Sequence, residues 1–341
     1  MNQDRFVDYL KENEEEQIVN LSLRPSNLSE FIGQEDIVSS LKIAIEAANK
    51  RSESLEHILL SGPPGLGKTS LAYCIAKEMG TTLTSTSGPA IERAGDLVGI
   101  LTNLEKGDIL FIDEVHRLSR VIEEFLYPAM ENYQIDFVVD KGPYAKSIKF
   151  NLKPFTLIGA TTRKGSLSAP LRGRFGLFFD LDFYPPGELI EVIKRSALLL
   201  DIEIDSLSCE MISRCSRGAP RLANRLLRRI RDYAQVKGEG KITFEIAQTA
   251  LGKIKIDNEG LDDLDRRYLM SIINVHDGGP VGIEAIAATL GEGKETLEDV
   301  VEPYLMKKGF IKRTPRGRMV SRHSYAHLNL PLPQNQQEKL F

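Results

Sequence analysis

The chain has 341 residues, of which 42% are hydrophobic and 27% are charged, and its formal net charge is -4. This length predicts two or three domains, and the net charge argues neither for nor against binding of nucleic acid, so only a local basic patch could indicate it. Three cysteines without a CxxC pair, and no apolar run near the about 20 residues that span a bilayer, argue for a reduced, cytoplasmic protein and against a membrane protein.

The N-terminal segment, residues 1–20, is acidic and lacks the apolar stretch of a secretory signal. We expect it to be a loosely attached arm. From residue 21 to residue 183, short apolar segments alternate with amphipathic ones, which predicts an α/β domain in which a parallel sheet carries helices on both faces. The predicted strands are HILLSG, GDILFIDEV and PFTLIGATT.

The segment GPPGLGKTS follows the first predicted strand and opens an amphipathic helix. It matches a P-loop, in which glycines such as Gly65 let backbone N–H groups turn toward phosphate. We expect Lys68 to contact the β- and γ-phosphates of ATP, and the Thr69 hydroxyl to bind Mg²⁺. An ordinary Gly-Pro loop is the alternative, and the flanking strand and helix argue against it.

Polar residues end the next two predicted strands. Asp113 is expected to bind Mg²⁺, and Glu114 to orient and polarise the attacking water, because a P-loop enzyme needs carboxylates beside the phosphates. Glu114 could also compensate the charge at a helix N-terminus. The hydroxyls of Thr161 and Thr162 could contact the γ-phosphate or the water, or could instead form an ST-turn at the end of the strand.

Residues 135–152 alternate in polarity about the turn DKGP, which predicts a β-hairpin inserted in the α/β domain. The apolar residues of this hairpin have no obvious place in an α/β core. They therefore indicate a protein partner, and local packing against the sheet is the alternative.

Two arginines, Arg172 and Arg174, lie close together in SAPLRGRFG and need anionic partners. In a simple parallel order Arg174 lies on the opposite side of the sheet from Lys68, so we do not expect it to reach the chain's own nucleotide. An arginine that acts on a neighbouring subunit's ATP could accelerate phosphoryl transfer. Surface pairing with Asp180 or Asp182 is the alternative.

Two further domains are predicted after the ATPase region. Four helical stretches in residues 184–255 indicate a small helical domain. After the linker KIDNEG, residues 256–330 contain three short helices and two β-capable arms about a Pro-Arg-Gly turn, which is typical of a winged helix. Residues 331–341 form a tail.

The winged helix carries a local basic patch. Seven basic residues and no acid occur from Lys307 to Arg322. Such a patch is typical of a surface that binds the phosphate backbone of DNA, and a solvated basic tail is the alternative. The third helix is acidic and therefore unsuited to the major groove, so we expect the wing, with Lys294 at the start of that helix, to grip phosphates.

Several motifs together resemble the RuvB family of bacterial Holliday-junction branch-migration motors. They are RPSNLSEFIGQE, GPPGLGKTSLA, LFIDEVHRL, GATTRKGSLSAPLRGRFG, GAPRLANRLLRRIRDYA and EPYLMKKGFIKRTPRGRM. This resemblance implies an AAA+ P-loop ATPase with a large domain, a helical lid and a C-terminal winged helix. It further implies a homo-hexameric ring that acts on junction DNA, with a RuvA-type partner bound to the hairpin.

The resemblance also assigns roles to individual residues. It implies that Arg221 is a second sensor that reaches the γ-phosphate of its own subunit, and that Arg174 is an arginine finger acting in trans. Arg313 and Arg318 correspond to DNA-binding positions, and at position 294 many relatives carry Arg where this chain has Lys294. The positions implied to lie near the nucleotide are Leu23, Arg24, Gly65, Lys68, Thr69, Ser70, Glu131, Asn132, Tyr133 and Tyr184.

The motifs predict an ATP-driven protein that binds DNA, and the resemblance implies a motor that promotes branch migration in recombination and repair. Two other functions remain open from the sequence. A clamp-loader-like AAA+ protein would act on a protein ring and would not need the basic wing. A winged-helix regulator would use ATP as a switch, and the acidic third helix argues against it.

Overall fold

The computed structural model describes residues 22–138 and 147–332. The predicted arm lies outside the described residues, as do the turn of the hairpin and all but the start of the tail. The chain divides into two compact units, Met1–Tyr184 and Pro185–Phe341. Among the described helices, none combines the length and the apolar character needed to cross a membrane.

The first unit is built on a five-stranded sheet in the order β2-β3-β6-β1-β7. All neighbouring strands are parallel, so their carboxyl ends meet at one edge. The sheet is apolar at its centre because helices cover both of its faces. Its strands are β1 (Ile58–Ser61), β2 (Leu83–Ser87), β3 (Ile109–Asp113), β6 (Thr156–Thr161) and β7 (Leu177–Asp180).

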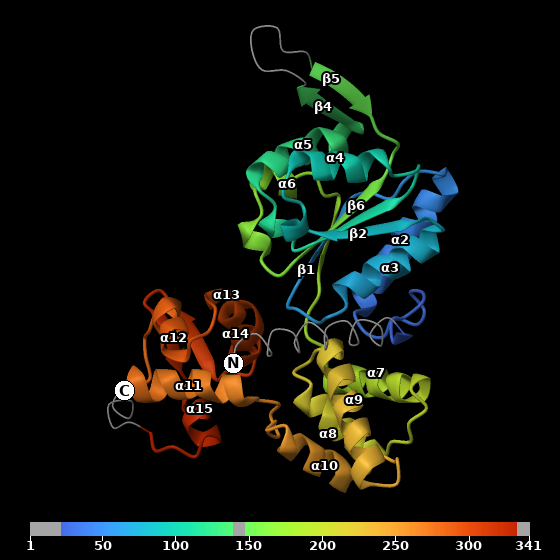
Figure 1. The fold of residues 1–341 in the computed structure, drawn as a ribbon. Helices are drawn as coiled ribbons and strands as arrows, with labels where there is room; N and C mark the ends of the chain where they lie inside the picture. Colours follow the sequence, from blue (N-terminus) through green and yellow to red (C-terminus); the bar gives the residue numbers. More distant parts are fainter. Residues whose placement is uncertain (1–21, 139–146, 333–341) are drawn as a thin grey trace. The chain divides into compact units, whose positions relative to one another are not determined.

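Helices cover the two faces of this sheet (Figure 1). Leu110 and Ile112 of β3 pack in a core cluster with residues of α4, α5 and α6, whereas α3 contacts the sheet from the other face beside α2. The predicted α/β sheet with helices on both faces is therefore confirmed. The helices are α2 (Glu35–Arg51), α3 (Lys68–Met79), α4 (Ala94–Thr102), α5 (Arg120–Asn132) and α6 (Ala169–Arg172).

A separate antiparallel pair follows α5, as predicted. It consists of β4 (Gln134–Val138) and β5 (Ser147–Asn151), which lie outside the main sheet (Figure 1). At its base, buried Ile135 lies opposite Phe150, whose side chain is exposed.

The second unit begins with four helices that form the predicted lid. They pack through the apolar side chains of α9, whose buried residues recur at helical spacing. The lid helices are α7 (Pro186–Leu199), α8 (Ser206–Cys215), α9 (Pro220–Lys237) and α10 (Phe244–Lys253).

The rest of the second unit is a winged helix, as predicted, with its own hydrophobic core. A π-helical turn, Leu297–Val301, joins α13 to α14 in the third helix. The two strands of the wing pair antiparallel, and Arg313 lies directly opposite Arg318. The elements are α11 (Asp263–Val275), α12 (Ile283–Leu290), α13 (Lys294–Thr296), α14 (Glu302–Lys307), β8 (Ile311–Thr314), β9 (Gly317–Val320) and the unpredicted α15 (Arg322–His327).

Candidate functional site

The P-loop connects the end of β1 to the start of α3. Gly62, Gly65 and Gly67 have φ angles of 139°, 80° and 98°, which side-chain-bearing residues rarely adopt. A Cβ atom on Gly62 would lie 2.3 Å from the carbonyl oxygen of Leu181, so glycine is required there. The loop therefore places backbone N–H groups at the N-terminus of α3, where the helix dipole favours an anion.

Lys68 lies folded over this loop and is 8% exposed. Its Nζ donates hydrogen bonds to the carbonyl oxygens of Gly62 at 2.7 Å and Pro63 at 2.9 Å. Thr69 and Ser70 follow in the first turn of α3. The ammonium, the loop amides and the Thr69 hydroxyl are together the groups that bind triphosphate and Mg²⁺ in P-loop enzymes.

The segment before α2 packs against α3, the helix that starts at the P-loop. The guanidinium of Arg24 lies 4.7 Å from the ring centroid of Tyr73, and Cys74 Sγ donates to the carbonyl of Pro25 at 3.4 Å. Leu23 is buried, and the hydroxyl of buried Tyr184 donates to the carbonyl of Leu66 in the loop at 3.4 Å. Leu23, Arg24 and Tyr184, three of the residues expected near the nucleotide, thus lie around the P-loop and its helix.

Thr161 and Thr162 follow the central strand β6, which lies between β1 and β3. The Thr161 hydroxyl is already bonded, to His116 Nδ1 at 2.9 Å and to the Arg163 N–H at 2.9 Å. By contrast, Thr162 Oγ1 is buried and has no hydrogen-bond partner among the described residues. A buried hydroxyl without a hydrogen-bond partner costs free energy unless a ligand or a water forms the missing hydrogen bond. The Thr162 hydroxyl is therefore the one with a hydrogen bond still to be made, and the expected role of Thr161 stays a prediction.

Asp113 and Glu114 lie at the end of β3, at the same edge of the sheet as the P-loop. Asp113 Oδ1 accepts a hydrogen bond from the Glu114 N–H at 2.9 Å, and Glu114 Oε2 lies 3.4 Å from Arg117 Nη1. No group of three or more His, Cys, Asp or Glu side chains in the described part of the chain could hold a metal ion. A hydroxyl and a carboxylate suit Mg²⁺, which usually keeps waters and shares the phosphates of its nucleotide.

The amino ends of the strands form the opposite edge of the sheet, and the C-terminal end of α5 packs against them. His57 precedes β1, is 8% exposed, and its Nε2 lies 3.0 Å from the carbonyl oxygen of Met130. Tyr133 packs edge-on against Phe155, which precedes β6, at 5.9 Å between ring centroids. Glu131, Asn132 and Tyr133 therefore lie near the amino ends of β1 and β6. They lie away from the chain's own P-loop, and their expected position near a nucleotide stays a prediction.

Arg174 belongs to this opposite edge. Its Nη2 lies 2.9 Å from Glu131 Oε1, its Nη1 donates to the carbonyl of Pro170 at 2.7 Å, and its guanidinium lies 4.3 Å from the ring centroid of Tyr127. Burial raises the pKa of Tyr127, whose hydroxyl donates to Glu123 at 2.9 Å. These contacts hold Arg174 away from the P-loop of its own chain, as the sequence predicted.

The predicted alternative for the two arginines is wrong for Arg174, since its acidic partner is Glu131. Asp180 instead pairs with Lys164 at 2.6 Å and accepts a hydrogen bond from Ser61. Lys164, with lesser contributions from Ser61 and Arg172, lowers the pKa of Asp180. Arg172 is thus only an electrostatic neighbour of Asp180.

Arg221 is the second residue of α9 and is exposed. It belongs to the second unit, whereas the P-loop belongs to the first. The Arg221 side chain is therefore exposed at the N-terminal end of a long helix.

The wing arginines differ in exposure. The Arg313 side chain is 58% exposed and lies 3.7 Å from Glu298. The Arg318 side chain is 8% exposed, with Nε 2.7 Å from Glu302 and Nη2 2.9 Å from Glu298. The hydroxyl of buried Tyr268 also donates to Glu302, at 2.7 Å.

Arg318 consequently does not fit the predicted DNA-binding role, because two glutamates of the third helix already occupy its guanidinium. The acidic residues that made this helix unsuitable for the major groove, Glu298 and Glu302, are the signal that could have identified the pairing. Lys294 is 48% exposed and forms an ion pair with Glu284 at 2.6 Å. Lys294 and Arg313 therefore remain the exposed candidates for contact with phosphate.

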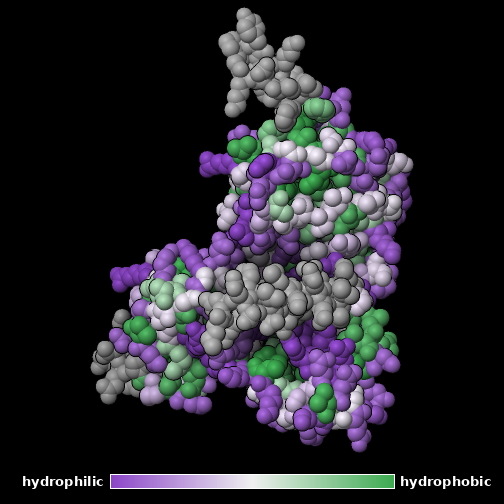
Figure 2. Space-filling view, in the orientation of Figure 1, coloured by the Kyte–Doolittle hydropathy of each residue, from purple (hydrophilic) through white to green (hydrophobic). Residues whose placement is uncertain are grey.

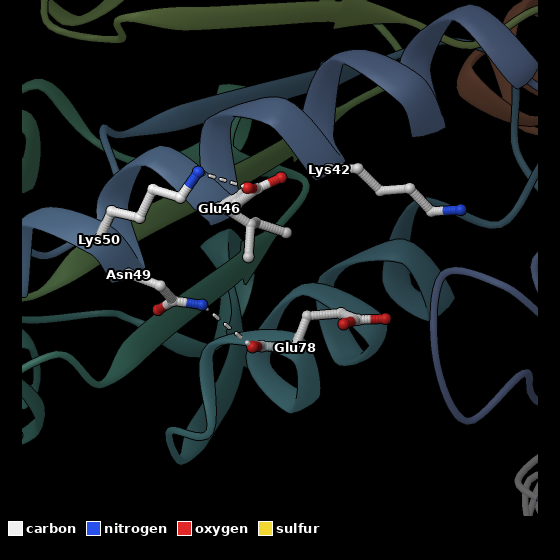
Figure 3. Close-up of a pocket in the computed structure, with 6 residues that line it drawn as sticks. Lys42, Glu46, Asn49, Lys50 and Glu78 are labelled. Carbon is white, nitrogen blue, oxygen red and sulfur yellow. Dashed lines mark hydrogen bonds and ion pairs between the residues drawn. The ribbon is translucent and has the colours of Figure 1, made fainter.

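A hollow between α2 and the end of α3 has a volume of about 380 Å³ (Figure 3). Its lining is mostly charged, and Lys50 and Glu46, one turn apart on α2, form an ion pair of 2.6 Å on its α2 side. None of the residues that line it belongs to the P-loop or to the ends of the strands. The hollow is thus distinct from the nucleotide site.

Three regions of the chain match families of known proteins. Residues 23–181 match the Holliday junction DNA helicase RuvB P-loop domain, residues 184–257 the RuvB AAA lid domain, and residues 258–329 the RuvB C-terminal winged helix domain.

Solved structures of Thermotoga maritima RuvB agree with these matches. One, described as a Holliday junction branch migration motor, is 50% identical over 92% of this chain and 100% of its own, with a TM-score of 0.85. Two mutants of that protein are also 50% identical, cover 91% of this chain and 99% or 100% of their own, and have TM-scores of 0.86. On these matches, and with the P-loop and winged helix in place, the chain belongs to the RuvB family of Holliday junction DNA helicases.

Proposed function

We propose that this chain is one subunit of a homo-hexameric ring that hydrolyses ATP and drives branch migration of Holliday junctions during DNA recombination and repair. The observation that carries the proposal is the position of Arg174, on the edge of the sheet opposite the P-loop. A subunit with its nucleotide at one edge and an arginine at the other is suited to a head-to-tail ring, in which each arginine meets the next subunit's ATP.

At the P-loop edge, the loop amides and Lys68 bind the phosphates, and Leu23, Arg24 and Tyr184 lie on the nucleoside side. Thr69 and Asp113 would hold Mg²⁺, which neutralises charge on the β- and γ-phosphates when it is bound. Glu114 orients and polarises the attacking water, and the Thr162 hydroxyl positions the water or the γ-phosphate. Arg221 of the lid responds to the γ-phosphate of its own subunit.

At the opposite edge, Arg174 stabilises the negative charge that develops on a neighbour's phosphate, an effect worth about 10³–10⁵ in rate in GTPases. Glu131, Asn132 and Tyr133 lie at the same edge and therefore near the neighbour's nucleotide, with Glu131 as the ion-pair partner of Arg174. Exposed apolar side chains of the lid, Leu198 at 81% and Val236 at 77%, support contacts between subunits. Separate hydrophobic patches are also visible on the mostly hydrophilic face of Figure 2.

The winged helix grips duplex DNA through phosphates, with Arg313 and Lys294 as its contacts and without reading bases. The hairpin formed by β4 and β5 docks a RuvA-type junction-binding protein, and exposed Phe150 supports an apolar contact there. An enzyme that uses ATP to move chromosomal junctions acts in the bacterial cytoplasm, where both are present.

Mixing two inactive variants tests the ring. Lys68→Ala removes the phosphate contact but keeps Arg174, and Arg174→Ala does the reverse, so each alone is expected to lose DNA-stimulated ATPase. An equal mixture should recover activity, because about a quarter of the interfaces in a head-to-tail ring then combine an intact P-loop with an intact Arg174. No recovery would remove the action in trans.

A four-way junction tests the reaction itself. The proposal expects ATP-dependent branch migration, enhanced by a RuvA-type protein. ATP-dependent binding to a sliding clamp would instead support a clamp loader, and sequence-specific DNA binding with negligible ATP turnover would support a regulator.

The two wing arginines separate DNA contact from structural support. Arg313→Ala is expected to weaken binding of all duplex sequences and to reduce the salt dependence by about one phosphate contact. Arg318→Ala leaves buried Glu302 without its cation and is expected to destabilise the winged helix by about 3–5 kcal/mol. Salt titrations of DNA binding and thermal unfolding measure the two effects. Equal loss of DNA affinity without loss of stability in both variants would restore Arg318 to the DNA-binding face.

A further inference from the structure

The segment that joins the lid to the winged helix, residues 255–262, packs closely against the end of α8. Cys215 Sγ donates to the carbonyl of Asp257 at 3.3 Å. Gly260 has a φ of 77°, and a Cβ atom there would lie 2.6 Å from the carbonyl oxygen of Cys215. The sequence predicted a linker here, but the backbone of this segment is fixed against the lid.

The other side of the same segment is fixed to the winged helix. The Tyr304 hydroxyl donates to the carbonyl of Glu259 at 2.6 Å, and Lys308 forms an ion pair with the Glu259 carboxylate at 2.9 Å. His327 Nε2 lies 2.9 Å from Asp257 Oδ2. Residues 255–262 are therefore held between two domains and do not form a flexible tether.

Arg217 spans this joint from the lid side and is only 11% exposed at its side chain. Its Nη2 lies 2.8 Å from Asp262 and 2.5 Å from Asp265, and its Nε donates to the carbonyl of Gly260 at 2.7 Å. The guanidinium also lies 5.7 Å from the ring centroid of Tyr304 in the third helix of the winged helix. One lid side chain thus contacts three separate parts of the winged helix and its lead-in.

Arg217 balances the negative charge of two neighbouring carboxylates, those of Asp262 and Asp265. They form a capping box at the start of α11, in which each carboxylate accepts the backbone N–H of the other residue. This motif brings two carboxylates together, and Asp265 is fully buried. Burial raises the pKa of Asp265 to about 7, and the nearby Arg217 opposes that shift. The start of α11 therefore depends on a cation supplied by the lid.

The backbone position of Arg217 connects this joint to the nucleotide-sensing end of the lid. Arg217 and Gly218 have positive φ angles of 52° and 72°, and α9 begins at Pro220. Buried Ser216 accepts the Ala219 N–H at 2.8 Å, which closes the turn. Arg221, the residue proposed to respond to the γ-phosphate, is in the first turn of the helix that this turn opens.

We propose that Arg217 is a positioning residue that couples the lid to the winged helix, so that both turn as one body when the lid responds to nucleotide. Arg217 contacts neither ATP nor DNA in this role. It transmits the movement of the N-terminal end of α9 to α11 and the wing through Asp262, Asp265 and Gly260. The functional part of this inference rests on the proposed ATP-driven motor.

A distance measurement tests the coupling without relying on that function. The three native cysteines are buried, so spin labels can be directed to Gln248→Cys in the lid and Ala288→Cys in the winged helix, both exposed positions. In the full chain with native Arg217, pulsed EPR should give one narrow distance distribution, unchanged between ADP and a non-hydrolysable ATP analogue. With Arg217→Ala the distribution should broaden. Exposed Arg214→Ala is the matched control and should leave it narrow. A distribution that is already broad with native Arg217, or that stays narrow in Arg217→Ala, would overturn the proposal.

The motor assay then measures the functional consequence. Arg217→Ala should keep DNA-stimulated ATPase within about twofold while junctions migrated per ATP fall by about five- to 150-fold, the usual range for coupling between sites. Asp262→Asn removes one partner of Arg217 at a partly exposed position and should give a smaller loss of junctions migrated per ATP. This second variant tests the coupling even if Arg217→Ala misfolds. Parallel losses of ATPase and migration in both variants, or no loss, would contradict the coupling. If the native chain migrates no junction, the proposed function fails while the EPR result still stands.

Discussion

The two edges of the large domain's sheet are built in different ways. The P-loop edge consists mainly of backbone groups and of residues adjacent in sequence, from Gly62 to Ser70. The Arg174 edge is assembled from side chains of α5, of the loop after α6 and of the residues that precede β1 and β6. The first site binds a ligand by its own local conformation. The second presents one guanidinium, whose charge is balanced by Glu131 of the same chain.

The energetics of the two edges agree with this difference. The Arg174–Glu131 pair is partly exposed, at 21% and 52% of the two side chains. Pairs of this kind contribute at most about 1 kcal/mol, so a phosphate with more negative charge can displace the carboxylate. Lys68, in contrast, is held within the loop by two carbonyl groups. We infer that Arg174 is releasable whereas the P-loop is already formed.

Substitution of the two strand-end threonines gives the largest expected effect and tests the assembly of the P-loop edge. Thr162→Val removes the buried hydroxyl without an internal partner and should lower kcat for ATP hydrolysis by about 10². Thr161→Val breaks the bonds to His116 and Arg163 and should chiefly lower thermal stability. Steady-state ATPase and thermal unfolding measure both. The opposite pattern, with a larger kcat loss for Thr161→Val, would return the catalytic role to Thr161.

Removing the resting partner of Arg174 sharpens the comparison at the other edge. Glu131→Gln should raise ATPase at limiting protein by less than about fivefold, because an ion pair worth at most about 1 kcal/mol no longer competes with the neighbour's phosphate. Exposed Glu124→Gln on the same helix is the control. ATPase measured against protein concentration gives the result. A strong decrease in Glu131→Gln would show that Glu131 itself contacts the neighbouring nucleotide.

The smallest expected effect concerns His57, which fixes α5 to the amino ends of the strands. Its Nδ1 accepts the Leu157 N–H at 2.9 Å, and burial lowers its pKa below the ordinary 6.5. Below about pH 6.5 the unfolded chain binds a proton that the folded one does not, so stability falls as the pH decreases. His57→Gln should be less stable at about pH 7.5, by about 1 kcal/mol for a lost hydrogen bond, and the difference should narrow by about pH 5.5. A gap in melting temperature that does not depend on pH would contradict this.

The sequence by itself determined the features that depend on neighbouring residues. Glycine spacing, a strand before and a helix after identify the P-loop, because its function resides in backbone conformation. The same holds for the lid helices and for the two arms of the wing, whose patterns are local. Even the separation of Arg174 from Lys68 follows from the order of a parallel sheet.

Only the tertiary structure decided which side chains are already occupied. Thr161 and Thr162 are neighbouring threonines that the sequence cannot tell apart. In the fold, the Thr161 hydroxyl forms a hydrogen bond with His116, whereas the Thr162 hydroxyl has no partner among the described residues. Arg313 and Arg318 both belong to a basic patch, yet Arg318 is buried and paired with glutamates of the third helix, whereas Arg313 is exposed. The predicted linker is held in place because Arg217, more than forty residues before Asp262 in the chain, binds the Gly260 carbonyl and the Asp262 carboxylate. A buried charge or hydroxyl is defined by partners distant in the chain, and a local pattern contains no information about them.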